Sequence, residues 1–122
     1  MFAYELQDRV MAAGKNVESY VCHPGASATS LIETSGSTVA KIMYRLMIKT
    51  PLVQTAEKGA YPEVMCATEG GLEQRAFYGP IGRMEFVGPV GKGVLEPYAY
   101  DKDVMTKLWE LSEKETGFKW NI

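Results

Sequence analysis

Apolar side chains recur at helical spacing in four segments of the chain, and each segment predicts a helix. The segment 2–13 starts on this pattern with no Ser, Thr, Asp or Asn to cap it, so we expect the chain to begin in mid-helix. The segment 37–48 has Ser35 or Ser37 as its cap. The apolar stripes are Phe2, Leu6, Val10 and Met11 in the first helix, and Val39, Ile42, Met43, Leu46 and Met47 in the second.

Two further helices are predicted at 55–68 and 103–116. Thr55 is a suitable N-cap for the first, and Pro62 should kink that helix or end its first turn. The last helix is capped by Asp101 or Asp103 and ended by Gly117. We expect its buried stripe to comprise Val104, Leu108 and Leu111, with Trp109 beside it.

Two short segments, 17–22 and 76–78, predict strands. The Gly/Pro-rich stretch 79–93 is expected to hold a hairpin around residues 84–87. Strands separated by helices favour parallel pairing and an α/β class. Two parallel strands share too little sheet for a complete fold, so we predict a single partial domain with an incomplete sheet over residues 1–122.

A small polar loop, residues 23–36, follows the more strand-like of these segments directly. Pro24 ends the strand and Gly25 permits a positive φ. Many α/β proteins bind a ligand at the carboxyl end of a strand, so this loop is the first candidate site. His23, which precedes it, is the single histidine of the chain; we expect it to pack beside the strand end, with a general base as the alternative.

Composition and net charge exclude some classes of function. The 46% of hydrophobic residues is ordinary for a folded domain. The net charge of −2 shows no basic excess, which argues against a general nucleic-acid binder and against a binder of anionic membranes. No apolar run is long enough to span a membrane, and no signal peptide is evident. We expect Cys22 and Cys66 to be free, buried thiols in a cytoplasmic protein, with a disulfide as the alternative.

Five segments in order carry a family resemblance: FAYELQDRV, VESYVCHPGASATSL, TAEKGAYPEVMCAT, AFYGP and KLWELSEKETG. They resemble the C-terminal half of short-chain dehydrogenases/reductases, nearest to the branch with retinol-dehydrogenase-like and bacterial oxidoreductase members. The resemblance implies the C-terminal portion of a Rossmann-like, doubly wound fold. The segment 2–13 would then be the second half of the helix whose first half carries the family's catalytic Tyr-x-x-x-Lys. The start at Met1 would reflect an internal methionine, a truncated gene or a cleaved protein.

The resemblance also implies a cofactor, NAD or NADP. Pro24, Gly25 and Thr29 match the family's Pro-Gly-x-x-x-Thr, which holds the nicotinamide carboxamide and the nearby ribose. The segment 30–54 lies where the family has its variable substrate lid, so Met43, Tyr44 and Met47 are candidates for lining an apolar substrate pocket; a core or oligomer contact is the alternative.

Catalytic residues and a phosphate-binding loop are not expected in this chain. The one Tyr-x-x-x-Lys, at Tyr98 and Lys102, follows Pro97 and precedes a helix cap, on the wrong side of the Pro-Gly loop. The glycines from 88 to 93 fit neither the dinucleotide pattern nor the Walker pattern. We expect no metal site.

Three functions follow from this. The first is a fragment of an NAD(P)-dependent oxidoreductase for a carbonyl or alcohol substrate, inactive alone and acting on a small molecule only in a full-length form. The second is a non-catalytic, self-associating remnant, for which residues 2–13 and 76–78 match elements that the family uses in subunit contacts. The third is a small binder of apolar ligands at 30–54. We expect a homo-oligomer that binds neither nucleic acid nor membrane.

Overall fold

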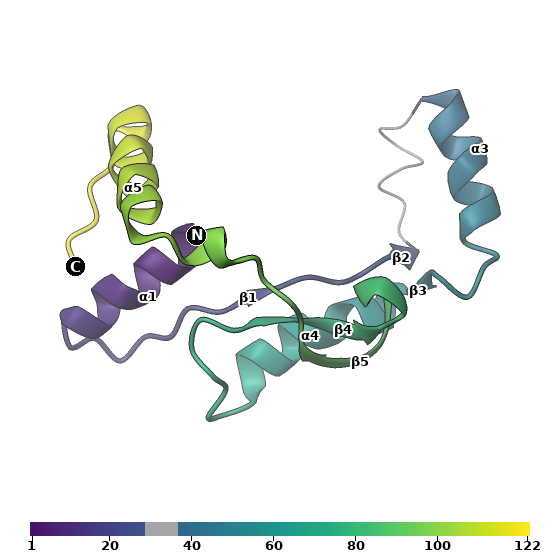
Figure 1. Cartoon of the computed structure of the whole chain (residues 1–122), viewed down its shortest axis with the longest axis horizontal. Helices are drawn as coiled ribbons and strands as arrows, with labels where there is room; N and C mark the ends of the chain where they lie inside the picture. The colour runs from purple at the N-terminus through teal and green to yellow at the C-terminus, as the bar shows by residue number, and fades with distance from the viewer. Residues whose placement is uncertain (29–36) are drawn as a thin grey trace. The chain divides into compact units, whose positions relative to one another are not determined.

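The computed structural model describes residues 1–28 and 37–122 (Figure 1). They form two compact units. Unit 1 comprises Met1–Val21, Glu73–Ala76 and Val94–Ile122, and unit 2 comprises Cys22–Leu72 and Phe77–Gly93. The chain combines four α-helices with five short strands among the described residues, which confirms the predicted α/β class.

Unit 1 is built on two helices, α1 (Phe2–Ala12) and α5 (Lys102–Thr116), with the short 3₁₀ helix η2 (Pro97–Tyr100) before α5. Its core is aromatic. Trp109 is 1% exposed and stacks on Phe2 with ring centroids 4.7 Å apart. The Arg9 guanidinium lies 4.7 Å from the centre of the Trp109 ring, a cation–π contact. These contacts join α1 to α5 and close the small core.

The ends of α5 follow the sequence prediction. Asp101 accepts hydrogen bonds from the backbone N–H groups of Asp103 and Val104, and Gly117 ends the helix in the left-handed conformation at φ 67°. Trp109 is buried, in agreement with its predicted place beside the stripe, but the predicted stripe itself is wrong, because Met105 is the other buried residue. These two lie four residues apart on the face that packs on α1, so the stripe Val104, Leu108 and Leu111 is left exposed.

Unit 2 contains a three-stranded sheet in the order β1-β4-β5, from strands β1 (Val21–Cys22), β4 (Phe77–Gly82) and β5 (Val87–Lys92). β4 and β5 pair antiparallel, and the turn between them includes the 3₁₀ helix η1 (Arg83–Glu85), which confirms the predicted hairpin. The predicted strand 17–22 is wrong in its first four residues. The backbone N–H of Ser19 donates to the Gln7 side chain rather than to a neighbouring strand.

A second, two-stranded pair lies within the segment predicted as loop. β2 (Ser27–Ala28) pairs in parallel with β3 (Gln54–Thr55). A strand of two residues leaves no periodic pattern in the sequence, so the prediction of loop at 27–28 was wrong. The pair places Ser27 and Ala28 of the Pro-Gly loop beside Gln54 and Thr55, which directly precede the helix that starts at Ala56.

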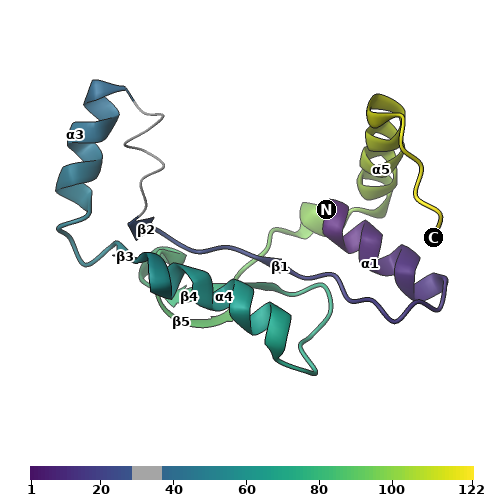
Figure 2. The same cartoon turned by 180° about the vertical axis from the view of Figure 1, so that it is seen from behind.

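Helices α3 (Thr38–Met47) and α4 (Ala56–Thr68) complete unit 2. Ser37 caps α3 and Thr55 caps α4, as predicted. α4 continues through Pro62, so the prediction that this proline ends the first turn was wrong. The Pro62 side chain is fully buried, and its packing offsets the lost backbone hydrogen bond. Figure 2 shows α4 running beside β4 and β5, which it contacts.

Candidate functional site

The Pro-Gly loop is held by its own backbone. Gly25 has φ +64°, and a Cβ placed there would lie 2.4 Å from the carbonyl oxygen of Phe86. The neighbouring N–H of Ala26 donates to that same oxygen at 2.8 Å. The carbonyl oxygen of Pro24 accepts from Ser27 Oγ and from Gln54 Nε2, both at 2.8 Å. Glycine is therefore required at position 25, and these hydrogen bonds hold the backbone of the turn in one conformation.

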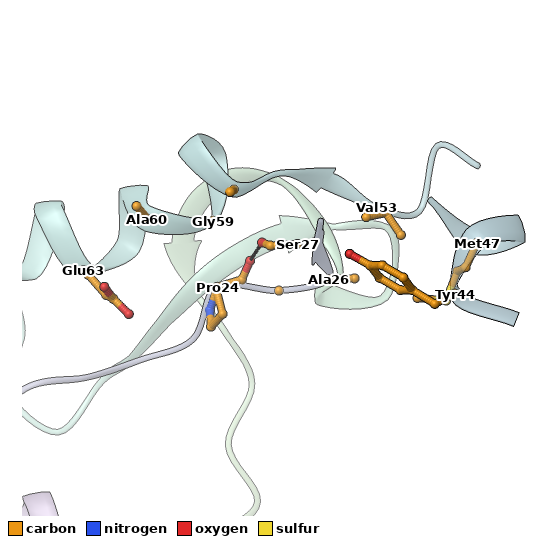
Figure 3. A pocket seen from close by; sticks show the side chains of 11 residues that line it. Pro24, Ala26, Ser27, Tyr44, Met47, Val53, Gly59, Ala60 and Glu63 are labelled. Atoms are coloured by element: carbon orange, nitrogen blue, oxygen red, sulfur yellow. Dashed lines mark hydrogen bonds between the residues drawn. The ribbon is translucent and has the colours of Figure 1, made fainter. Parts of the chain in front are cut away.

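A cavity of about 440 Å³ opens beside this loop, within unit 2 (Figure 3). Tyr44 reaches into its wall from α3, and its side chain is 7% exposed although α3 is otherwise largely open. Met47 also lines this cavity, and Glu63 is the acidic residue of the lining. The remaining walls come from the loop and from α4: Pro24, Gly25, Ala26, Ser27, Val53, Ala56, Gly59 and Ala60.

The structure thus brings together four of the six residues that the sequence singled out: Pro24, Gly25, Tyr44 and Met47 line one cavity. Met43 does not line it; its side chain is 65% exposed on α3. Thr29, the sixth, lies outside the described residues.

Two residues that shape the site, Gln54 behind the loop and Gly59 in the cavity lining, were not predicted from the sequence. Gln54 is buried and holds the loop through Pro24, although it comes 30 positions later in the chain. Gly59 sits in the middle of α4, where a Cβ would lie 2.2 Å from Ser27 Oγ. A glycine inside a predicted helix is the signal for such a close approach. Gln54 carried no comparable signal, because nothing local to it indicates its partner.

His23 packs beside the strand end, as expected. Its ring stacks on Phe77 with centroids 4.6 Å apart, and Nδ1 accepts from the N–H of Gly25 at 3.3 Å. Nε2 is buried with no hydrogen-bond partner within the described ranges, and a Cβ on Gly79 would lie 2.0 Å from it. The imidazole is wedged against the sheet, and these contacts suit a packing role better than proton transfer to a ligand.

The two cysteines are free thiols, as predicted, but they are half-buried and not fully buried, and they are neighbours in space. Desolvation by burial, followed by the proximity of Cys66, raises the pKa of Cys22 from 9.0 to about 11. Burial also raises the pKa of Cys66. Both groups are therefore protonated near neutral pH, and neither is prepared as a nucleophile.

The other motif matches lie apart from the cavity lining. Tyr98 is 70% exposed in η2, and Lys102 is the first residue of α5. Gly88 and Gly91 belong to β5, so they do not form a loop that leads into a helix. Across residues 1–28 and 37–122 no group of three His, Cys, Asp or Glu side chains is placed to hold a metal ion. None of the helices described there is long and apolar enough to cross a membrane.

Comparison with known proteins gives relatives over nearly the whole chain. Human and bovine retinol dehydrogenase 12 are each 28% identical to it over 120 residues, which cover 98% of this chain and 34% of theirs. A crystal structure of an uncharacterised protein from Mycobacterium paratuberculosis superposes with a TM-score of 0.67 at 26% identity, over 99% of this chain and 36% of that one. No family model matches the chain.

The chain spans about a third of the length of these relatives. The structural match, the incomplete sheet and the parallel pair β2–β3 agree with a partial Rossmann-like fold. The chain is therefore a distant homologue of retinol dehydrogenase 12, a short-chain dehydrogenase/reductase, over a segment that corresponds to about a third of that protein.

Proposed function

We propose that this chain is the C-terminal, nicotinamide-side portion of an NAD(P)-dependent oxidoreductase that interconverts a carbonyl and an alcohol. The observation that carries the proposal is the Pro24-Gly25 turn, which lines one cavity with Tyr44 and Met47 in a chain homologous to a retinol dehydrogenase. The cofactor, when bound, would exchange a hydride with the substrate carbon. The chain supplies the walls that hold and orient the reacting groups.

The residues of the cavity fit the nicotinamide end of such a cofactor. Gly25, without a side chain, lets a flat ring approach the backbone, and Ala26, Met47 and Val53 provide apolar walls beside it. The fit does not extend to the phosphates, because no glycine-rich loop leads into a described helix. We therefore propose that the chain alone binds the cofactor weakly and does not turn over substrate.

The binding half of this proposal is tested with cofactor fragments. We expect nicotinamide mononucleotide at millimolar concentration to shift the amide NMR signals of Gly25, Ala26 and Ser27, because these residues line the cavity. Adenosine monophosphate is the matched control, since the adenine half has no site here. Shifts from the adenine nucleotide instead, or shifts confined to unit 1, would contradict the proposal.

The catalytic half is tested by turnover. The purified chain is mixed with NADH or NADPH and an apolar aldehyde, and absorbance at the reduced nicotinamide band is followed. We expect this absorbance to fall no faster than it does without the protein. Steady cofactor oxidation that requires the chain would show that it holds its own acid and base, and would refute the proposed inactivity.

A second candidate is a self-associating protein, and the exposed stripe of α5 favours it. Val104, Leu108 and Leu111 lie along one face of α5 and are uncovered in unit 1. β4 already has a strand on each side, so an added strand would have to join an outer strand of the sheet, β1 or β5. Under this candidate the chain is a homo-oligomer, and Leu108→Asp lowers its mass in sedimentation velocity. A monomer at micromolar concentration refutes it.

A third candidate is a small binder of apolar ligands, which would use the same cavity without a cofactor. It predicts that an apolar fluorescent probe is displaced by alkyl aldehydes but not by nicotinamide mononucleotide. Displacement by the nucleotide would favour the oxidoreductase fragment over this candidate.

A further inference from the structure

Helix α3 separates its charged and apolar side chains completely. Lys41 and Arg45 lie four positions apart on one side of α3, and Lys49, in the turn just after the helix, continues the same spacing; these three side chains form the basic ridge. All three are basic, and the sequence has no acidic residue between positions 34 and 56. The rest of the helix surface is apolar apart from its first turn. The local charge is thus strongly positive in a chain whose net charge is −2.

The apolar face of α3 is exposed. Val39 is 70% and Leu46 63% exposed, and Ile42 and Met43 beside them are also more than half exposed. Tyr44 is the one buried residue of the helix, so α3 is attached to unit 2 by its opposite side. The sequence predicted this stripe as the apolar face of the helix, and the structure leaves the face exposed.

We infer that α3 docks on the surface of an anionic phospholipid bilayer, with its apolar face in the headgroup–acyl boundary and its basic ridge among the lipid phosphates. A short basic helix with one uncovered apolar face has the composition of an interfacial helix. The helix would lie on the membrane and not across it, in agreement with the absence of a membrane-spanning helix in the described ranges.

Charge complementarity selects a lipid surface over a second copy of α3. Two copies that packed this face together would bring two identical basic ridges close, with no acidic side chain on either helix to neutralise them. An anionic bilayer neutralises all three cations and covers the apolar side chains at the same time. The whole-chain charge, which argues against membranes in the sequence, hides this local arrangement.

The proposal is independent of the proposed oxidoreductase function, because it uses neither the Pro-Gly loop nor a cofactor. It is tested by flotation of the purified chain with vesicles of equal parts phosphatidylcholine and phosphatidylserine, and with vesicles of phosphatidylcholine alone. We expect binding to the mixed vesicles that weakens as salt is added, and little binding to the neutral ones. Each basic residue at the surface should contribute about a fivefold change in affinity.

Variants assign the binding to α3. Arg45→Glu with Lys49→Glu should weaken binding by at least about 25-fold, from two such contributions. Lys107→Glu with Lys114→Glu is the matched control, since it makes the same change in net charge on exposed positions of α5 and should leave binding unchanged. Arg45→Gln with Lys49→Gln removes the two positive charges without reversing them. Circular dichroism checks that each variant is folded. Val39→Ser with Leu46→Ser tests the apolar face.

The proposal is overturned if the chain fails to float with the mixed vesicles or binds neutral vesicles equally well. It is also overturned if the α5 control weakens binding as much as the α3 variant does. Sedimentation velocity distinguishes a second copy as the occupant. If Val39→Ser with Leu46→Ser converts an oligomer into a monomer and vesicle binding is absent, α3 is a subunit contact and not a lipid contact.

Discussion

Replacing Gly25 by alanine tests the geometry of the Pro-Gly loop. At φ +64° an L-residue is strained by about 1–2 kcal/mol. The new Cβ would also lie 2.4 Å from the Phe86 carbonyl oxygen and 2.5 Å from Pro80 Cγ, and relieving such overpacking costs about 1–3 kcal/mol. The N–H of Ala26 donates to the same carbonyl, so moving it weakens that hydrogen bond as well. We expect Gly25→Ala to lower the free energy of unfolding by about 2–5 kcal/mol.

Gly71→Ala provides a matched control in the same unit. Gly71 has φ +77°, and a Cβ added there would have no atom within 4 Å. Alanine at this position therefore introduces the backbone strain without the steric clash. Its expected cost is about 1–2 kcal/mol. Urea unfolding followed by far-ultraviolet circular dichroism measures both variants against the unsubstituted chain. If Gly25→Ala costs no more than Gly71→Ala, the loop is not pinned against Phe86 and the described geometry is wrong.

Three further predictions concern stability. Trp109→Ala should cost about 3–5 kcal/mol because the ring is 1% exposed, whereas Leu111→Ala, at a position 52% exposed, should cost under about 1 kcal/mol; equal losses in urea unfolding would contradict the assigned core. Asp101→Ala should cost about 0.5–2 kcal/mol through the lost cap of α5, and an unchanged unfolding midpoint would refute the capping role. Stability should also fall as pH rises. The Cys22 thiol ionises near 9 in the unfolded chain but, with its pKa raised to about 11, stays protonated in the folded one, and burial raises the pKa of Tyr4 from 10.0 to about 12 in the same direction. A midpoint that does not move between pH 8 and pH 11 would contradict this.

The local features of the chain were predictable from its sequence. Ser37, Thr55 and Asp101 cap their helices and Gly117 ends the last one, because a cap depends on a side chain and the backbone of the next few residues. The hairpin after residue 79 follows from its run of glycines and prolines in the same way. Pro24 and Gly25 were identified as a turn for the same reason.

Long-range choices were not predictable. The 104, 108 and 111 positions of α5 are as apolar as a buried stripe should be, yet α1 packs against Met105 and Trp109. In α3 the apolar stripe is exposed and Tyr44 is buried. In both helices the sequence offers more than one apolar face, and only a packing partner selects between them.

The candidate site also combines features that the local sequence determines with features that depend on long-range packing. The sequence by itself determined the turn at Pro24 and Gly25, because proline and glycine restrict or release the backbone wherever they occur. Only the tertiary structure decided that Gln54 would hold this turn, that Gly59 would admit Ser27 and that Tyr44 and Met47, but not Met43, would line the cavity. Those contacts join residues far apart in the chain, so they exist only once the strands and helices have packed.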